Sequence, residues 1–392
     1  MMTKYKKLFE PVTFSNGVKA QNRFMLAPMC DDSAENGQVT DQQLEYMKSR
    51  AANVGIAVTG YAYVNDSGDQ VPGQLSVAHD EDINGLAKLA TVMKAGGAKA
   101  ILQLSHAGRG AGGSVAKGYR VYAPSKLPFP WLDYDVDEMT TADIEQVIND
   151  YVQATKRRMA AGLVGFEVIN CNHDLLQQFF SASANHRTDE WGGSREKRMA
   201  LPLAIQRAVK KVIAESGNAN FILGWRISPQ EKHGDEIGYD VDDMFAQTKK
   251  VAELGIDYLN ISLNLSADYS NSVRPSYDVK VKGTNKSFPE YYRAALRGYC
   301  PIYIGSNVLT ADDALAAVTD AEGVYVGREL LMDPDFVQKI AEDRPEEIVN
   351  TTTIEKLKAV GLPDGFVDNY ADKDGSTRVV SYRNGIPLPG LD

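Results

Sequence analysis

The segment GFEVINCNHDLLQQFF, from Gly165 to Phe180, joins an apolar run to a compact polar cluster. Residues 164–169 have the apolar character of a buried strand. The residues that follow are polar or carry a thiol: Asn170, Cys171, Asn172, His173 and Asp174. Parallel α/β proteins keep their functional groups just beyond the carboxyl ends of their strands. The segment therefore predicts a strand that leads directly into a functional site.

The same unit recurs along the chain. Short apolar runs predict strands at residues 22–30, 54–64, 98–105, 164–169, 221–228, 256–262, 301–306 and 323–327. Helical spacing predicts helices at residues 82–94, 195–214 and 244–254, and further helices after the capping pairs Thr40–Gln43, Thr140–Asp143 and Thr310–Asp313. Eight strands, most of them separated by helices, predict a (β/α)8 barrel, because a doubly wound sheet should break this rhythm.

Two regions fall outside the repeat. Residues 106–138 are rich in glycine, proline and aromatic residues, and loops of this length usually form lids or binding loops. The polar loop 263–287 is expected to help shape the substrate pocket. We assign residues 1–341 to the barrel and residues 342–392 to a C-terminal extension, which is expected to pack on the barrel or on a neighbouring subunit.

Bulk properties limit the class of protein. The 392-residue chain has a net charge of −10, which argues against binding nucleic acid, since that function needs a concentrated basic face. Its 3 cysteines are odd in number and widely spaced, as expected for reduced thiols in the cytoplasm and for neither a disulfide framework nor a zinc site. No apolar run approaches the roughly 18 residues of a membrane span. We expect a cytoplasmic protein with a small-molecule substrate, compatible with a homo-oligomer.

The predicted strand ends carry groups suited to a planar polar heterocycle with a phosphate. Small residues after strands seven and eight are typical of a barrel phosphate site. Arg226 ends an apolar strand, where a charge is costly unless it faces an anion. The strand-end residues are Pro28, Met29, Cys30, Gly60, Tyr61, Gln103, Asn172, His173, Asp174, Arg226, Ser262, Asn264, Gly305, Ser306, Asn307, Gly327 and Arg328.

Several motifs resemble the old yellow enzyme family of FMN-dependent NAD(P)H oxidoreductases. They are LFEPVTFSNGVKAQNRFMLAPM, ILQLSHAGR, QQFFSASANHRTDEWGGSREKR, WRISP and VGRELLMDPDF. The resemblance runs from about Leu8 to Phe336, and the QLSHAGR and RTDEWGGS blocks are specific. It implies bound FMN, and NADH or NADPH as the reductant.

The resemblance also implies roles for individual residues. Ala27, Pro28, Met29 and Cys30 would border the isoalloxazine ring, and Tyr61 would meet it through its backbone. Gln103 would pair with the pyrimidine edge, and Arg226 would lie beside N1 and the C2 carbonyl. Gly305, Ser306, Asn307, Gly327 and Arg328 would hold the phosphate. For Cys30, a role in redox tuning and simple burial as a small hydrophobe are both open.

The opening segment departs from the family pattern. Family members usually carry a histidine, then His or Asn three residues later, and a tyrosine two residues further on. The register of LLQQFF places Ile169, Asn172 and Asp174 at these positions, so only Asn172 remains as an amide donor. Losing a donor aimed at a developing oxyanion costs about 3 kcal/mol. Asp174 could donate a proton only if burial raises its pKa.

We therefore predict an FMN-dependent oxidoreductase that takes hydride from NAD(P)H at flavin N5 and passes it to an organic acceptor, with Asn172, Asp174 and Cys30 as candidate catalytic residues. Ile169 and Asp174 suggest an alternative, a flavin store or sensor with little turnover. A lyase or aldolase without flavin would need a strand-end lysine or a metal-binding carboxylate cluster. The strand ends supply neither, and we expect no metal site.

Overall fold

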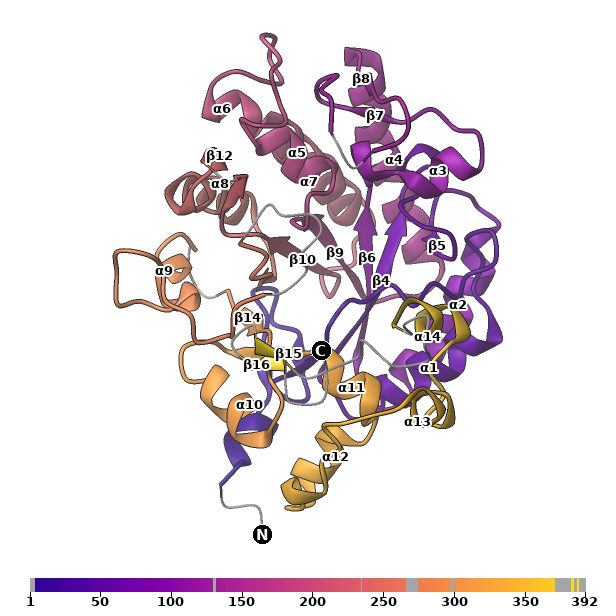
Figure 1. Cartoon of the computed structure of the whole chain (residues 1–392), viewed down its shortest axis with the longest axis vertical. Coiled ribbons are helices and arrows are strands. Elements are labelled where there is room, and N and C mark those ends of the chain that lie inside the picture. Colours follow the sequence, from indigo (N-terminus) through magenta and orange to yellow (C-terminus); the bar gives the residue numbers. More distant parts are fainter. Residues whose placement is uncertain are drawn as a thin grey trace.

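The strands of the chain close into a ring with helices around it (Figure 1). The computed structural model describes residues 4–129, 132–233, 235–265, 274–296, 298, 300–370, 382–383 and 386–387. The ring strands are β3 (Phe24–Leu26), β4 (Ile56–Tyr63), β6 (Lys99–Ser105), β9 (Gly165–Asn170), β10 (Ile222–Ile227), β13 (Tyr258–Ile261), β14 (Ile302–Gly305) and β15 (Gly323–Val326). Each pairs in parallel with the next, and β15 pairs with β3. The predicted (β/α)8 barrel is confirmed.

Helices follow most of the ring strands. They are α1 (Asp41–Ala51), α2 (Asp82–Lys94), α3 (Gly112–Ala116), α4 (Thr141–Ala160), α5 (Leu175–Phe180), α6 (Arg195–Arg198), α7 (Ala200–Glu215), α8 (Val241–Leu254), α9 (Phe288–Arg293), α10 (Ala311–Ala317), α11 (Arg328–Met332), α12 (Phe336–Ala341), α13 (Ile354–Ala359) and α14 (Asp364–Tyr370). Short 3-10 turns are η1 (Lys6–Phe9), η2 (Asp66–Gly68), η3 (Gly108–Gly110) and η4 (Pro345–Glu347).

The predicted helix starts mostly hold, with two corrections. The helix predicted at 244–254 begins at Val241, after a capping box of Asp240 with Asp243, and one predicted capping box is incomplete. Thr140 and Thr310 form complete capping boxes with Asp143 and Asp313. Thr40 accepts a bond from the backbone of Gln43, but the Gln43 side chain does not return it. Its amide instead donates to both carboxylate oxygens of Asp31, at 2.8 and 2.9 Å. The Thr40 box is therefore half formed, because a tertiary partner takes the side chain that would close it.

Tyrosines fill the interior of the barrel where neighbouring strands carry glycine. A Cβ atom on Gly224 would lie 2.2 Å from the Tyr258 ring, and one on Gly323 would lie 2.0 Å from the Tyr303 ring. Below them the hairpin of β1 (Val12–Thr13) and β2 (Lys19–Ala20) belongs to the same apolar cluster as the barrel interior. The lower half of the barrel is thus a packed apolar core, and polar groups are left to its upper half.

The described residues of the long segment 106–138, called the cover below, form short elements. After η3 and α3 it contributes β7 (Tyr122–Ala123) and β8 (Asp137–Glu138), which pair in parallel. Residues 108–113 read GRGAGG, the letters of a dinucleotide-binding motif, but they form η3 and the start of α3 and not a strand–turn–helix unit. The backbone N–H of Arg109 donates to the Gln178 side chain on α5 at 3.1 Å, which anchors the cover to the element after β9.

The described part of the C-terminal region packs on the first helix of the barrel. Phe366 of α14 lies 5.9 Å from the Tyr46 ring of α1, and α13 and α14 lie beside α1 in Figure 1. A Cβ atom on Gly365 would lie 2.1 Å from the carbonyl oxygen of Asp32. Much of the predicted extension, including most of GIPLPGLD, lies outside the described residues, where β16 (Tyr382–Arg383) and β17 (Ile386–Pro387) form one small pair.

The remaining short strands lie outside the ring or at its edge. β5 (Leu75–Ser76) adds to β4, and β11 (Glu231–His233) pairs antiparallel with β12 (Glu236–Tyr239) after β10. Among the described residues we find no helix with the length and apolarity needed to cross a bilayer.

Candidate active site

A layer of polar side chains lies inside the barrel above the tyrosines. Glu167 of β9 is fully buried and accepts hydrogen bonds from the Gln103 amide at 2.6 Å and from the Asn260 amide at 2.9 Å. Burial raises the pKa of Glu167, and the nearby Arg226 guanidinium opposes this shift. Three strands, β6, β9 and β13, thus meet through one carboxylate at the centre of the barrel.

Sequence reasoning missed Glu167, although its signal was present. A carboxylate in an otherwise apolar strand is costly unless it is paired, which is the same argument that identified Arg226. The register places Glu167 opposite Gln103 on β6 and opposite Gly224 on β10, the strand that also carries Arg226. Its partners come from strands remote in sequence, so only the closed barrel reveals them.

Three buried polar atoms of this layer have no hydrogen-bond partner within the described protein. They are the Gln103 Oε1 and Asn260 Oδ1 acceptors and the Arg226 Nε donor. Gln103 is 1% and Arg226 is 3% exposed, so bulk water does not readily satisfy them. Buried polar groups are usually paired, and an exception calls for a ligand or another explanation. An unpaired acceptor and an unpaired donor fit the polar edge of a flavin ring.

The end of β3 lies against the ends of two other strands. A Cβ atom on Gly60 would lie 2.6 Å from the Met29 carbonyl oxygen and 2.9 Å from the Cys30 Cα. A Cβ atom on Gly327 would lie 3.4 Å from the Met29 sulfur and 3.7 Å from the Ala27 Cβ. Ala27 and Pro28 are buried, whereas Met29 and Cys30 are partly exposed. The structure therefore brings the predicted ring-bordering segment next to Tyr61 and the predicted phosphate segment.

The turn after β14 has an unusual backbone. Ser306 and Asn307 have φ values of 93° and 53°, and both are non-glycine residues in the left-handed region. Such strain persists where the surroundings enforce it, and it is concentrated at functional sites. The Arg328 guanidinium donates to the Asn307 side-chain oxygen, so the turn after β14 and the start of α11 are linked. Gly305, Ser306, Asn307, Gly327 and Arg328 are thus brought together as predicted.

The turn after β9 has the same property. Asn172 and His173 have φ values of 57° and 66°. The Asn172 backbone N–H donates to Ser228 Oγ at 3.1 Å, and the His173 N–H donates to Gln177 Oε1 at 3.0 Å. These bonds hold two successive left-handed residues in place. Ile169 is the last residue but one of β9. It is buried and pairs in register with Arg226 of β10.

The carboxyl group of Asp174 is buried beside cationic and phenolic groups. Burial raises the pKa of Asp174 well above its usual value, and the Arg226 charge only partly opposes the shift. Asp174 in turn contributes to the raised pKa of Tyr61, whose largest cause is burial, followed by Cys30. The direction of this shift agrees with the condition set from the sequence, namely that burial raises the pKa of the Asp174 carboxyl.

Cys30 behaves as a protonated thiol. Burial raises its pKa well above the usual value, and the nearby carboxylates of Asp32 and Asp31 add to the shift. Reactive cysteines carry a lowered pKa because the thiolate is the nucleophile. Cys30 is therefore unsuited to nucleophilic attack, while tuning of a neighbouring ring by its S–H group is compatible with this environment.

Arg274 joins the site, although nothing in the sequence singled it out. Its Nη2 donates to Asn172 Oδ1 at 3.2 Å, and Ser262 Oγ donates to the same oxygen at 3.0 Å. Arg274 comes from the loop after β13, about a hundred residues from Asn172. Such a distant pairing leaves no local sequence signal.

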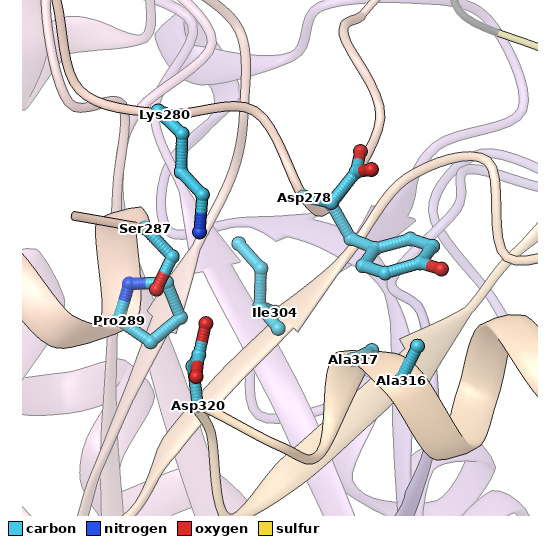
Figure 2. A pocket seen from close by; sticks show the side chains of 9 residues that line it. Asp278, Lys280, Ser287, Pro289, Ile304, Ala316, Ala317 and Asp320 are labelled. Carbon is cyan, nitrogen blue, oxygen red and sulfur yellow. The ribbon is translucent and has the colours of Figure 1, made fainter. Parts of the chain in front are cut away.

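A cavity of about 140 Å³ lies on the flank of the barrel, beneath the same loop. In Figure 2, Lys280 and Ser287 lie on one side of it, and Ala316 and Ala317 of α10 lie on the other. The residues that line it are Tyr277, Asp278, Lys280, Ser287, Pro289, Ile304, Ala316, Ala317 and Asp320. None of the site residues predicted from the sequence belongs to this lining, so the cavity is separate from the strand-end site.

Comparisons with known proteins agree with the geometry. Residues 7–347 match the model of the NADH:flavin oxidoreductase / NADH oxidase family. The chain is 34% identical to a probable NADH-dependent flavin oxidoreductase of Bacillus subtilis, YqiG, over 89% of this chain and 91% of that protein. It is 38% identical to an NADH:acrylate oxidoreductase of Vibrio harveyi, over 97% of this chain but only 38% of that longer protein.

A solved structure shows the same fold. The old yellow enzyme homologue of Zymomonas mobilis superimposes with a TM-score of 0.75 at 22% identity, covering 91% of this chain and 99% of that one. The chain therefore belongs to the NADH:flavin oxidoreductase / NADH oxidase family, and it is an FMN-dependent NAD(P)H oxidoreductase of the old yellow enzyme type.

Proposed function

We propose that the enzyme reduces alkenes conjugated to a carbonyl group, using hydride from NADH or NADPH. FMN, when bound, would supply the hydride transfer from the nucleotide to the acceptor. The acceptor gains this hydride at one alkene carbon and a proton at the other, so NAD(P)H is oxidised and the C=C bond becomes a C–C bond. The observation that supports the proposal best is the pair of unpaired buried atoms, Gln103 Oε1 and Arg226 Nε, at the barrel mouth.

In this proposal the polar layer holds the flavin ring. The Gln103 amide already donates to Glu167, so its free oxygen can accept from a ring N–H. The Arg226 cation stabilises negative charge that collects on the reduced ring. Ala27, Pro28, Met29 and Cys30 border the ring, and Tyr61 approaches it from the next strand.

The two strained turns bind different ligand groups: the turn after β14 binds the flavin phosphate, and the turn after β9 binds the acceptor carbonyl. Backbone N–H groups of Ser306, Asn307 and Gly327, with the Arg328 cation, hold the phosphate, since turns of this kind expose N–H groups to anions. At the opposite side, the Asn172 amide binds the acceptor carbonyl. Asp174 supplies the proton, since burial raises its pKa and so favours the neutral carboxyl.

The test is anaerobic and stepwise. NADH or NADPH should bleach the flavin absorption, and 2-cyclohexenone or another conjugated alkene should restore it. Unchanged absorbance with both nucleotides would contradict the oxidoreductase function. Bleaching without reoxidation by any alkene in a broad panel would contradict alkene reduction and would favour a flavin store or sensor.

The store or sensor is supported by one observation, the apolar side chain of Ile169 at a position where a carbonyl-binding donor is expected. The double variant Ile169→His, Asp174→Tyr restores both family side chains. A gain in 2-cyclohexenone reduction would show that these donors limit the natural enzyme. The single variant Ile169→Val, which adds no donor, is the control.

We also propose that the protein works in the cytoplasm and that residues 342–392 form a C-terminal extension to the barrel of residues 1–341. Cys30, Cys171 and Cys300 are all free thiols, which suits a reducing compartment. Size-exclusion chromatography with light scattering will show whether the enzyme is a homo-oligomer.

A further inference from the structure

Glu167 is a buried acidic residue that the proposed reaction does not use. It lies on β9, and its side chain is fully buried in the barrel interior. Its Oε1 accepts a hydrogen bond from the Gln103 amide at 2.6 Å, and its Oε2 accepts one from the Asn260 amide at 2.9 Å. A carboxyl group in such a place is costly unless it is paired. Amides from two other strands therefore occupy both of its oxygens.

The carboxylate of Glu167 determines which way these two amide groups face. An ionised carboxylate can only accept hydrogen bonds, so Gln103 and Asn260 must each turn a nitrogen toward it. Their oxygens consequently face away from Glu167, and among the described residues neither oxygen has a hydrogen-bond partner. An amide in place of the carboxylate would also donate, and it would turn one of these oxygens inward. Glu167 thus leaves two acceptor oxygens available to a ligand.

Glu167 also interacts with the Arg226 cation. Arg226 lies on β10, which pairs with β9 on one side and with β13, the strand of Asn260, on the other. Burial alone would lower the pKa of Arg226. This pKa is nevertheless raised, because of the neighbouring Cys171, Glu167 and Tyr325. Arg226 and Glu167 are therefore coupled within one buried layer, where charges interact more strongly than in water.

We propose that Glu167 is a positioning residue for FMN and that its negative charge keeps the redox potential of the bound flavin low. The layer fits the flavin ring, because Gln103 Oε1 and Arg226 Nε are left without partners in the described protein. Negative charge collects on the reduced ring, so the Arg226 cation favours the reduced state and the Glu167 carboxylate opposes this effect. A low potential favours hydride donation to the acceptor. The inference depends on bound FMN and not on which acceptor is reduced.

The redox potential of the bound flavin tests the role of the charge. Glu167→Gln keeps the size of the side chain and removes its charge. The ratio of the dissociation constants for oxidised and reduced FMN should then increase roughly 10-fold or more, as expected when one charge is removed from a buried site. For a two-electron couple, a 10-fold change in this ratio raises the potential by about 30 mV. Anaerobic equilibration of the holoenzyme with a reference dye measures the potential.

Two further variants separate the charge from packing. Glu167→Asp keeps the charge on a shorter side chain, so the ratio should change less than about 3-fold while FMN binds more weakly in both redox states. Asp257→Asn is the matched control. It also converts a buried carboxylate into its amide, but Asp257 directly precedes β13 and accepts from the Leu223 N–H at 2.7 Å. Equal losses of affinity for oxidised and reduced FMN in Glu167→Gln, with an unchanged potential, would overturn the inference and leave Glu167 a merely structural role.

Infrared difference spectroscopy of the wild-type holoenzyme needs no variant. Spectra of the oxidised and reduced states, recorded with and without carbon-13 in the glutamate carboxyl groups, identify the glutamate bands. Every glutamate band that changes on reduction should belong to the ionised form. A protonated glutamate band in either state would overturn the inference, even if Glu167→Gln does not fold. Failure to reduce any alkene would change neither readout, so it would contradict the proposed function alone.

Discussion

At the scale of single residues, the site depends on groups whose environment overrides their ordinary chemistry. Asp174 occupies the position that the family resemblance assigns to a tyrosine, and burial raises the pKa of its carboxyl well above the usual value. Burial likewise raises the pKa of the Cys30 thiol. Residue type alone would have predicted a carboxyl pKa of about 4 and a thiol pKa of about 8.5.

The proton-donor role of Asp174 predicts a pH dependence. The raised pKa means that the folded enzyme binds this proton more tightly than the unfolded chain does. The pKa of Asp174 in the folded enzyme lies above the ordinary value of about 4. The rate of alkene reduction should therefore stay constant at pH values below this pKa and should fall as the pH rises through it. Asp174→Asn should reduce turnover about 100-fold and remove that fall.

Single-turnover reoxidation of reduced flavin by an alkene, measured across pH, checks this prediction. The rate of bleaching by NADH serves as the control, because it needs no proton from Asp174. A pH profile that persists unchanged in Asp174→Asn would assign proton donation to another group.

At the scale of elements, close backbone contacts position the loop after β3 at the mouth of the barrel. The α14 helix touches the loop that carries Cys30, because Gly365 lies directly against the Asp32 carbonyl. Asp32 has a φ of 46°, so the loop is already in a conformation that non-glycine residues seldom adopt. We interpret α14 as a brace for this loop.

This interpretation predicts the effect of one methyl group. Gly365→Ala would place a Cβ 2.1 Å from a backbone oxygen, so helix or loop must shift. We expect a loss of about 1–3 kcal/mol in the free energy of unfolding and an altered flavin absorption spectrum. Urea denaturation and absorption spectroscopy measure the two effects. Gly110→Ala is the control, since a Cβ there has nothing within 4 Å; an equal effect in both variants would refute the brace.

At the scale of the whole molecule, the barrel separates an apolar lower core from a polar upper layer. Tyr258 and Tyr303 fill the lower part, while Glu167, Gln103, Asn260 and Arg226 occupy the upper part with unpaired atoms left over. A bound ligand that pairs those atoms should stabilise the whole fold, since binding to the folded state alone shifts the unfolding equilibrium.

Removal of FMN should therefore lower the melting temperature. Adding FMN at about 1,000 times its Kd should restore roughly 4 kcal/mol of stability. Riboflavin should restore less, because it lacks the phosphate that the turn after β14 and the Arg328 cation are proposed to bind. Thermal melting of the apoprotein with each compound gives the answer, and equal stabilisation by both would argue against the phosphate assignment.

The sequence by itself determined the eight strands, most helix starts and the strand-end groups, because apolar periodicity, capping residues and Gly-rich ends are local properties of the chain. It also placed Ile169, Asn172 and Asp174. Only the tertiary structure decided that Glu167 links three strands, that α14 rests on Asp32, that burial raises the pKa of Asp174 and that Arg274 reaches Asn172. These features depend on contacts between distant segments and on the exclusion of water, which exist only once the barrel has closed.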